Sequence, residues 1–276
     1  MILKLNLFWK EILLFSPTLL LGILAAYNHV PLAKENIVAL ESFSWSDVVI
    51  FLILFLVLSL FFTKFKKISS VLLKLFLILV VFSGSQIIFG SFLNTPWDLF
   101  GAIFLASFFV LLKNVFIHDL GMVFGIAGAA SLLGLNLIPA TAIILLVILS
   151  FYDIVAVYWT KHMVTLARGM MESGAIFGFI IPFEFKDFFH HSGEAKQKIG
   201  EKFMILGSGD IGLPIVMASS VAVISISQAL TVGLFSLLGL FLTHLIFVNQ
   251  TAKGPMAALP PIATLTIIGY LVSQLL

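Results

Sequence analysis

Residues 140–160 read ATAIILLVILSFYDIVAVYWT, and Asp153 is the only charged residue in this stretch. An α-helix rises about 1.5 Å per residue, so the stretch is long enough to cross the hydrocarbon core of a bilayer, which is about 30 Å thick. The sequence therefore predicts a transmembrane helix that carries one acidic residue in its apolar interior.

The whole chain has the composition of a membrane protein. Hydrophobic residues make up 61% of its 276 residues and charged residues 10%, against roughly 25% in soluble domains, which excludes a soluble fold. The chain has no cysteine, so disulfides, thiolate nucleophiles and Cys-ligated metals are excluded. A net charge of +2 is too small for a nucleic-acid-binding surface. We expect a polytopic protein that contacts membrane lipid and binds no nucleic acid.

Nine apolar segments are separated by short polar breaks. We expect all nine to be helices, because a backbone in hydrocarbon must satisfy its own hydrogen bonds and the segments are too uniformly apolar for barrel strands. The predicted fold class is an all-α polytopic membrane protein, with residues 1–276 as a single nine-helix domain. The predicted spans are Ile12–Tyr27, Val48–Thr63, Val71–Phe89, Leu99–Leu112, Leu120–Leu137, Ala140–Thr160, Phe203–Ser225, Ala229–Val248 and Met256–Leu276.

The distribution of basic residues predicts the orientation. If the N-terminus is cytoplasmic, Lys34 alone falls outside, and the other 14 of the 15 basic residues lie on the inner side. The tryptophans lie at span ends, where indole rings prefer to sit. We therefore expect a multi-pass protein of the cell membrane, with a cytoplasmic N-terminus and the C-terminus outside.

Residues 161–202 form the predicted cytoplasmic loop between the sixth and seventh spans. Within the loop, Gly174–Phe185 reads GAIFGFIIPFEF, which is too short to span and too apolar for a free loop. We expect either an interfacial segment or a lid or strand beside a substrate path. The loop also contains His190, His191 and Glu194, which we interpret as solvated side chains, so we expect no metal site.

Two acidic residues lie deep within predicted spans. Asp153 lies eight residues before Lys161, and Asp210 lies eight residues after Lys202. At helical rise, each carboxyl is roughly 12 Å inward from the cytoplasmic flank. Consecutive antiparallel helices pack at axis distances of about 8 to 10 Å, so the two carboxyls can meet.

Such a pair can hydrolyse an amide. A carboxylate in a bilayer costs at least a few kcal/mol, and two of them repel, so we expect the pair to share one proton near neutral pH. The base then takes a proton from water while the acid protonates the carbonyl oxygen. This chemistry needs no cofactor beyond the catalytic water and no metal.

The residues beside each acid fit that chemistry. Tyr152 precedes Asp153 and can supply a hydroxyl group, although it can instead pack against another span. Gly207 and Gly209 flank Ser208 directly before Asp210, which allows close helix approach and access for a substrate backbone.

The last span opens with two prolines, in the run Ala257–Pro261 (AALPP). They remove two backbone donors and fix an extended entry, which leaves carbonyls and small side chains open at the same depth. The alternative interpretation is an ordinary proline cap at a helix N-terminus.

Taken together, these motifs resemble the presenilin and signal peptide peptidase family of intramembrane aspartyl proteases. The resemblance covers essentially the whole chain. It suggests that the chain is a compact archaeal presenilin homologue. It rests on Tyr152-Asp153 in the sixth of nine spans, Gly207-Ser208-Gly209-Asp210 in the seventh, the loop between them and Ala258-Leu259-Pro260 at the ninth.

The resemblance assigns roles to these positions. It implies that Asp153 and Asp210 are catalytic, that Tyr152 and the Gly207–Gly209 run support the active site, and that Ala258, Leu259 and Pro260 position the substrate. Two residues depart from the family pattern: Ser208 stands where presenilins usually have leucine, and Ala257 stands where the fuller motif has its first proline. The run after Asp210 is similar to the signal peptide peptidase branch, whereas the orientation is that of presenilins.

The implied function is hydrolysis of peptide bonds within transmembrane helices of membrane proteins or signal peptides. These substrates would be the partners of the protein. The sequence is compatible with a homo-oligomer and leaves accessory subunits open. The main alternative is a proton- or cation-coupled transporter, because paired intramembrane acids also build ion sites. Prepilin peptidases also use a GxGD motif, but their basic residue soon after the aspartate is absent here, where Ile211, Gly212 and Leu213 follow.

Overall fold

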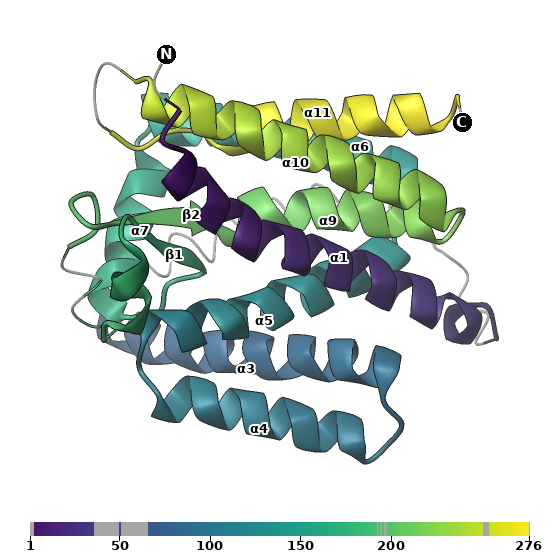
Figure 1. Cartoon of the computed structure of the whole chain (residues 1–276), viewed down its shortest axis with the longest axis horizontal. Helices are drawn as coiled ribbons and strands as arrows, with labels where there is room; N and C mark the ends of the chain where they lie inside the picture. The colour runs from purple at the N-terminus through teal and green to yellow at the C-terminus, as the bar shows by residue number, and fades with distance from the viewer. Residues whose placement is uncertain are drawn as a thin grey trace.

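The computed structural model describes residues 3–35, 66–191, 198–250 and 254–275, together with Ile50, Gly193 and Ala195. These residues are mostly helical, and two short strands form a small sheet at one end of the helices (Figure 1). The elements are α1 (Leu5–Glu35), α3 (Lys66–Phe92), α4 (Trp97–Leu111), α5 (Val115–Leu135), α6 (Pro139–Ile154), the π-helical η1 (Val155–Trp159), α7 (His162–Ser173), β1 (Gly178–Pro182), the 3-10 helix η2 (Phe185–Phe189), β2 (Phe203–Gly207), α9 (Ser208–Ala222), α10 (Ile226–Val248) and α11 (Leu259–Ser273).

Most of the predicted spans coincide with helices. The span Val48–Thr63 lies outside the described residues, apart from Ile50. Each of the other predicted spans overlaps a helix. In the described part of the chain, five helices are long and apolar enough to cross a membrane, and α4, α9 and α11 are shorter apolar helices.

The expectation that every span is wholly helical is wrong at the start of the seventh. Phe203–Gly207 forms strand β2, and α9 begins only at Ser208. β2 pairs antiparallel with β1, with Ile180 opposite Ile205, so the main-chain groups on the side of β2 that faces β1 are satisfied by a neighbouring strand. A five-residue apolar run fits a strand as well as a helix. Within Gly174–Phe185 the structure has the strand β1, and the expected place of this strand beside a substrate path stays a prediction.

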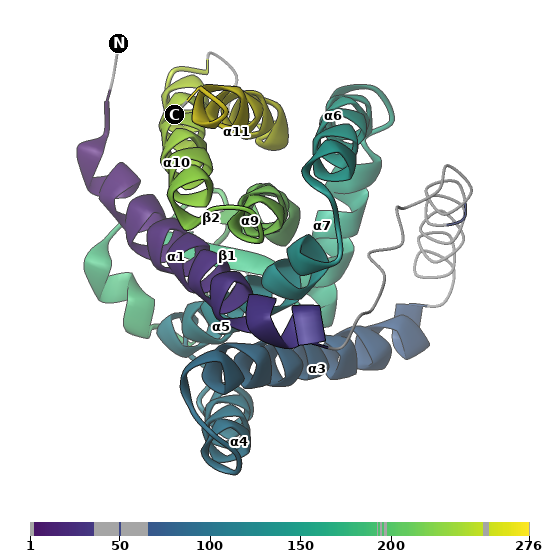
Figure 2. The ribbon, with the colours of Figure 1, turned by 90° about the vertical axis from the view of Figure 1, so that its right-hand side faces the viewer.

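Helix α9 lies at the centre of the bundle. It contacts α1, α5, α6, α10 and α11, and Figure 2, a view along the helices, shows it surrounded by them. Every residue from Pro214 to Ala222 is buried. The body of α9 is therefore held by contacts on all sides, and the first turn, which carries Asp210, extends from it.

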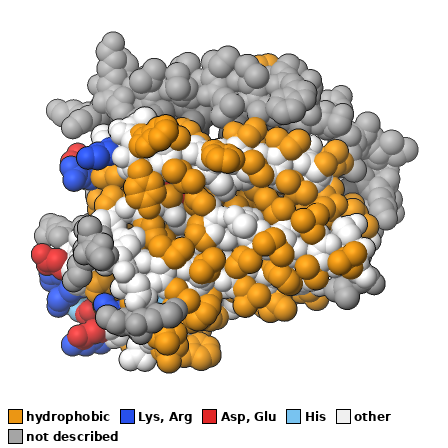
Figure 3. All heavy atoms as spheres, turned by 90° about the horizontal axis from the view of Figure 1, so that it is seen from above, with side chains coloured by type: hydrophobic (Ala, Val, Ile, Leu, Met, Phe, Trp, Pro, Cys, Tyr) orange, Lys and Arg blue, Asp and Glu red, His pale blue; other side chains and the backbone are white. Residues whose placement is uncertain are grey.

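The surface divides into a charged end and an apolar lateral face. Figure 3 shows charged side chains gathered at the end where α7 and the sheet lie, and mostly hydrophobic side chains over the rest of the described surface in that view. Large apolar residues such as Leu13, Leu79 and Leu234 are exposed along the helices. An apolar lateral face is what a helix bundle presents to lipid.

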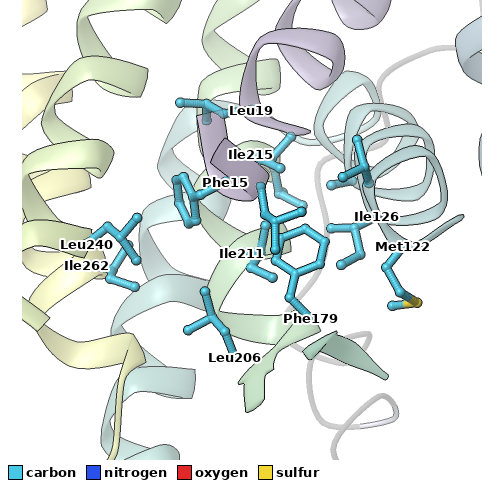
Figure 4. Packing of buried hydrophobic residues seen from close by; sticks show 14 of the residues in the cluster. Phe15, Leu19, Met122, Ile126, Phe179, Leu206, Ile211, Ile215, Leu240 and Ile262 are labelled. Atoms are coloured by element: carbon cyan, nitrogen blue, oxygen red, sulfur yellow. The ribbon is translucent and has the colours of Figure 1, made fainter. Parts of the chain in front are cut away.

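A hydrophobic cluster ties the sheet to the helices. Phe179 of β1 is fully buried and lies among Ile211 of α9, Met122 of α5 and Phe15 of α1 (Figure 4). Burial of a phenylalanine side chain contributes about 1.5–3 kcal/mol to stability. The sheet and α9 thus share one hydrophobic core, which fixes the position of β2 relative to Asp210.

Candidate active site

Asp153 lies in the last turn of α6, directly before the chain continues as the π-helical turn η1. Asp153 is buried, with 8% of its surface exposed, and its Oδ2 accepts a hydrogen bond from the backbone N–H of Leu259 at 3.3 Å. The preceding Tyr152 is partly buried and interacts electrostatically with the Asp153 carboxylate. π-helical turns are rare in proteins, and those that occur are often found at functional sites. The position of η1 directly after Asp153 fits that tendency.

The donor to Asp153 comes from the start of α11. Leu259 is the first residue of this helix, so its N–H has no acceptor within the helix. The prolines that follow occupy first-turn positions, where a missing N–H costs nothing. Ala258 precedes the helix, and its carbonyl accepts a hydrogen bond from Thr243 Oγ1 at 3.4 Å. This segment therefore offers Asp153 the positive end of a helix, whereas the sequence had suggested open carbonyls.

Asp210 is the third residue of α9 and is partly buried. Its carboxylate accepts a hydrogen bond from the backbone N–H of Gly207 and lies within electrostatic range of the Asp153 carboxylate. Helix α6 contacts α9, and α11 contacts both of them. The structure thus places two acids from separate helices, and the start of a third helix, at one locus.

The residues before Asp210 differ in how much room surrounds them. Gly207 ends β2, and a Cβ there would lie 3.0 Å from the Asp210 carboxylate, so a larger residue would displace the acid. Gly209 is exposed, and a Cβ there would meet nothing within 4 Å. Ser208 is partly buried, and its N–H donates to the Phe177 carbonyl at 3.2 Å, which extends the β1–β2 ladder.

A second set of ionisable side chains is buried near the sheet, and sequence reasoning missed it by treating these residues as belonging to span ends. Lys10 and Asp119 are each 1% exposed, and His118 is 8% exposed. Glu11 Oε1 lies 2.8 Å from His244 Nδ1 and joins α1 to α10. The available signal was the adjacency of two ionisable residues inside an otherwise apolar helix start, at Lys10-Glu11 and again at His118-Asp119.

The loop histidines have local contacts. His190 Nδ1 lies 3.2 Å from Asp187 Oδ1, and His191 Nδ1 accepts a hydrogen bond from the Gly193 N–H at 3.1 Å. Glu194 lies outside the described residues. Among the residues that are described, no three His, Asp or Glu side chains form a group that could hold a metal ion, and the absence of a metal site stays a prediction.

Comparison with known proteins places the chain in a family. Residues 16–276 match the family described as signal-peptide peptidase, presenilin aspartyl protease. Two solved structures of a presenilin family intramembrane aspartate protease are similar over nearly the whole chain. The one in space group C222 has 25% identity and a TM-score of 0.59, covering 96% of this chain and 97% of that one. The one in space group P2 has 26% identity and a TM-score of 0.60, covering 94% and 95%. No curated protein matches this chain. The chain belongs to the signal-peptide peptidase and presenilin family of aspartyl proteases.

Proposed function

We propose that this protein is a GxGD-type intramembrane endopeptidase that hydrolyses peptide bonds within transmembrane helices, with Asp153 and Asp210 as its catalytic residues. Water is the nucleophile, and no metal or further cofactor takes part. The observation that supports the proposal is that α6, with Asp153 in its last turn, and α9, with Asp210 in its first turn, contact one another and both contact α11, whose first N–H binds Asp153.

The chemistry follows from a shared proton. One carboxylate accepts a proton from water, and the carboxylic acid of the other donates its proton to the carbonyl oxygen of the scissile bond. Because the two groups titrate together, the proton belongs to the pair rather than to either residue. The Leu259 N–H donates to Asp153 and orients that carboxylate.

The topology we propose has nine spans, a cytoplasmic N-terminus and the C-terminus outside, in the cell membrane. The gathering of charged side chains at the end that holds the sheet supports a cytoplasmic location for that end (Figure 3). Substrates with their N-termini outside would then enter laterally and be cut in the cytoplasmic third of the bilayer.

Cleavage requires the substrate helix to unwind locally, because its peptide bonds are shielded by their own hydrogen bonds. The outer edge of β2 is suited to hold the unwound strand by main-chain pairing. Ile205 directs its N–H and C=O away from β1, and within the described residues no hydrogen bond is found on that side of it. Two residues further along, the Gly207 N–H already binds Asp210. A strand added at this edge therefore runs directly beside the catalytic acid.

The remaining site residues have supporting roles in this proposal. Ala258, Leu259 and Pro260 position the substrate and orient Asp153 through the Leu259 N–H. The partly buried Tyr152 lies next to Asp153, where its hydroxyl can contact the reacting groups. Gly207 leaves room for the Asp210 carboxylate, and Ser208 anchors the end of β2.

Gly209→Ala is expected to lower cleavage about 10- to 100-fold without loss of stability. The methyl group fits the enzyme, because nothing lies within 4 Å of it, but it occupies open space where the substrate backbone approaches Asp210. Steady-state cleavage and thermal unfolding of the purified variant check both parts. Gly169→Ala, on α7 with equally open surroundings, is the matched control and should leave cleavage unchanged. Equal activity of both variants would show that the substrate does not approach Gly209.

The experiment that tests the function is reconstitution of the purified protein in liposomes with a labelled peptide that contains one transmembrane helix. We expect cleavage within the helix, and inhibition by a hydroxyl-containing transition-state analogue of peptide hydrolysis. Ion flux that depends on Asp153, without any cleavage, would instead support a cation-coupled transporter.

A further inference from the structure

The outer edge of β1, the edge that faces away from β2, is occupied by side chains. In an antiparallel ladder, alternate residues direct their main-chain groups toward the partner strand and away from it. The Phe183 N–H donates to the Lys202 carbonyl, so the odd-numbered residues of this segment face β2. Gly178, Ile180 and Pro182 therefore direct their main-chain groups to the outer edge.

Each of these three residues binds a buried ionisable side chain from a helix. The contacts run from Ile180 N–H to Asp119 Oδ1 at 2.8 Å, from His118 Nε2 to the Gly178 carbonyl at 3.1 Å, and from Lys10 Nζ to the Pro182 carbonyl at 2.9 Å. Lys10 Nζ also donates to the Phe183 carbonyl at 2.6 Å. Because proline has no N–H, Pro182 needs no acceptor on this edge.

The two strands of the sheet therefore differ in accessibility. Every residue of β1 is buried, whereas Met204, Ile205 and Gly207 of β2 are partly exposed. A buried charge is costly unless it is paired or hydrogen-bonded, so three such side chains on one strand edge need a reason. On the β1 edge the Gly178 C=O, the Ile180 N–H and the Pro182 C=O are already bonded to side chains, and every residue is buried, so a second strand cannot pair there. On the β2 edge Phe203 is bonded to Lys198 and Gly200, which leaves, among the described residues, the partly exposed Ile205, two residues before Gly207, as the open position.

We propose that Lys10, His118 and Asp119, the β1-edge triad, are positioning residues that anchor the sheet to α1 and α5 and direct the unwound substrate strand to β2. The inference rests on the proposed protease function and assigns the triad no contact with the reacting atoms. Helices α1 and α5 also contact α9, which carries Asp210. The triad therefore fixes the position of the sheet relative to Asp210. A fixed frame holds the paired strand in one register relative to the acids, so the pattern of cleavage positions depends on the triad.

The first test is the distribution of cleavage sites, read by mass spectrometry of the products. Asp119→Ala leaves the Ile180 N–H without its acceptor, and we expect products from additional sites displaced by one or more residues. Asp119→Asn keeps a carbonyl oxygen as acceptor and should restore the wild-type site. Glu11→Gln weakens the neighbouring buried pair with His244 without touching the sheet, so it should lower stability and leave the site unchanged. Wild-type products from Asp119→Ala would overturn the inference.

The second test leaves the triad intact, so it does not depend on the folding of a triad variant. The chain has no cysteine, so a single introduced thiol can be crosslinked to a substrate with one cysteine near its cleavage site. Ile205→Cys and Ile180→Cys are matched, because the two residues are register partners at the middle of each strand. We expect a disulfide with Ile205→Cys and none with Ile180→Cys. Crosslinking at Ile180→Cys would contradict the proposal.

These outcomes separate the inference from the proposed function. If wild-type protein does not cleave the peptide, or if Asp153→Ala cleaves it as well as wild type does, the function itself fails. If wild type cleaves, Asp153→Ala does not, and Asp119→Ala keeps the wild-type site, the function stands and only the role of the triad is lost.

Discussion

Asp153→Asn and Asp210→Asn are each expected to lower cleavage of a transmembrane peptide by about 10²–10⁴-fold, the usual contribution of a general acid or base. Each amide keeps the size of the carboxyl but can neither accept nor supply the proton that the pair shares. Initial rates at equal amounts of folded protein measure the loss. Because the two acids act as one unit, the double variant should be scarcely less active than either single variant.

The matched control is Asp98→Asn. Asp98 lies in the first turn of α4, at the end of the bundle away from the sheet (Figure 1). Like Asp210, it is an acidic residue in the first turn of a helix, so Asp98→Asn removes a comparable carboxylate far from the site. Its cleavage rate should equal that of wild type. Activity within two-fold of wild type in either active-site variant would contradict the roles proposed for the two acids.

Gly128→Val is expected to lower the free energy of unfolding by about 3 kcal/mol or more, as overpacking does where the backbone itself must move. Helices α3 and α5 are in direct backbone contact at this point. A Cβ at Gly128 would overlap the carbonyl oxygen of Gly84, and a Cβ at Gly84 would lie 2.5 Å from the carbonyl oxygen of Gly125. Small residues of this kind let membrane helices approach closely, and the approach is lost when a side chain is added.

The measurement is the thermal midpoint and the yield of monodisperse protein in detergent. Gly169→Val is the control, since that glycine of α7 has open surroundings and its substitution should change the midpoint little. Because α5 carries His118 and Asp119, protein of Gly128→Val that still folds should also cleave at additional positions. Equal midpoints for the two variants would show that α3 and α5 are not held together at the glycines.

The helical bundle and the contact between the two helices that carry the acids could be predicted from the sequence because both follow from strong, simple signals. Apolar runs such as 140–160 have no other stable form in a bilayer. Asp153 and Asp210 are conspicuous because acids inside such runs are rare, and their equal spacing from Lys161 and Lys202 predicted that they meet.

The strand at Phe203–Gly207 could not be predicted from its composition. Its partner β1 lies some twenty residues earlier in a loop, and a short apolar run does not tell a strand from the end of a helix. The depth estimate for Asp210 assumed helical rise, which does not apply to β2, where the rise is about 3.3 Å per residue.

The buried triad was missed for a different reason. Lys10, His118 and Asp119 lie close to predicted span ends, where ionisable side chains are usually solvated. The loop instead folds back, and β1 covers them: its carbonyls accept hydrogen bonds from Lys10 and His118, and its Ile180 N–H donates to Asp119. Burial here depends on tertiary contacts between residues 60 or more positions apart in the sequence, such as Asp119 and Ile180. No local sequence pattern records such contacts.

The most direct test of the central claim is an experimental structure of the wild-type protein with a peptide analogue that carries a hydroxyl group in place of the scissile carbonyl. The account predicts that this hydroxyl lies between the carboxyls of Asp153 and Asp210, within hydrogen-bonding distance of both. An analogue bound elsewhere, with the two carboxyls pointing to different sides of the bundle, would contradict it.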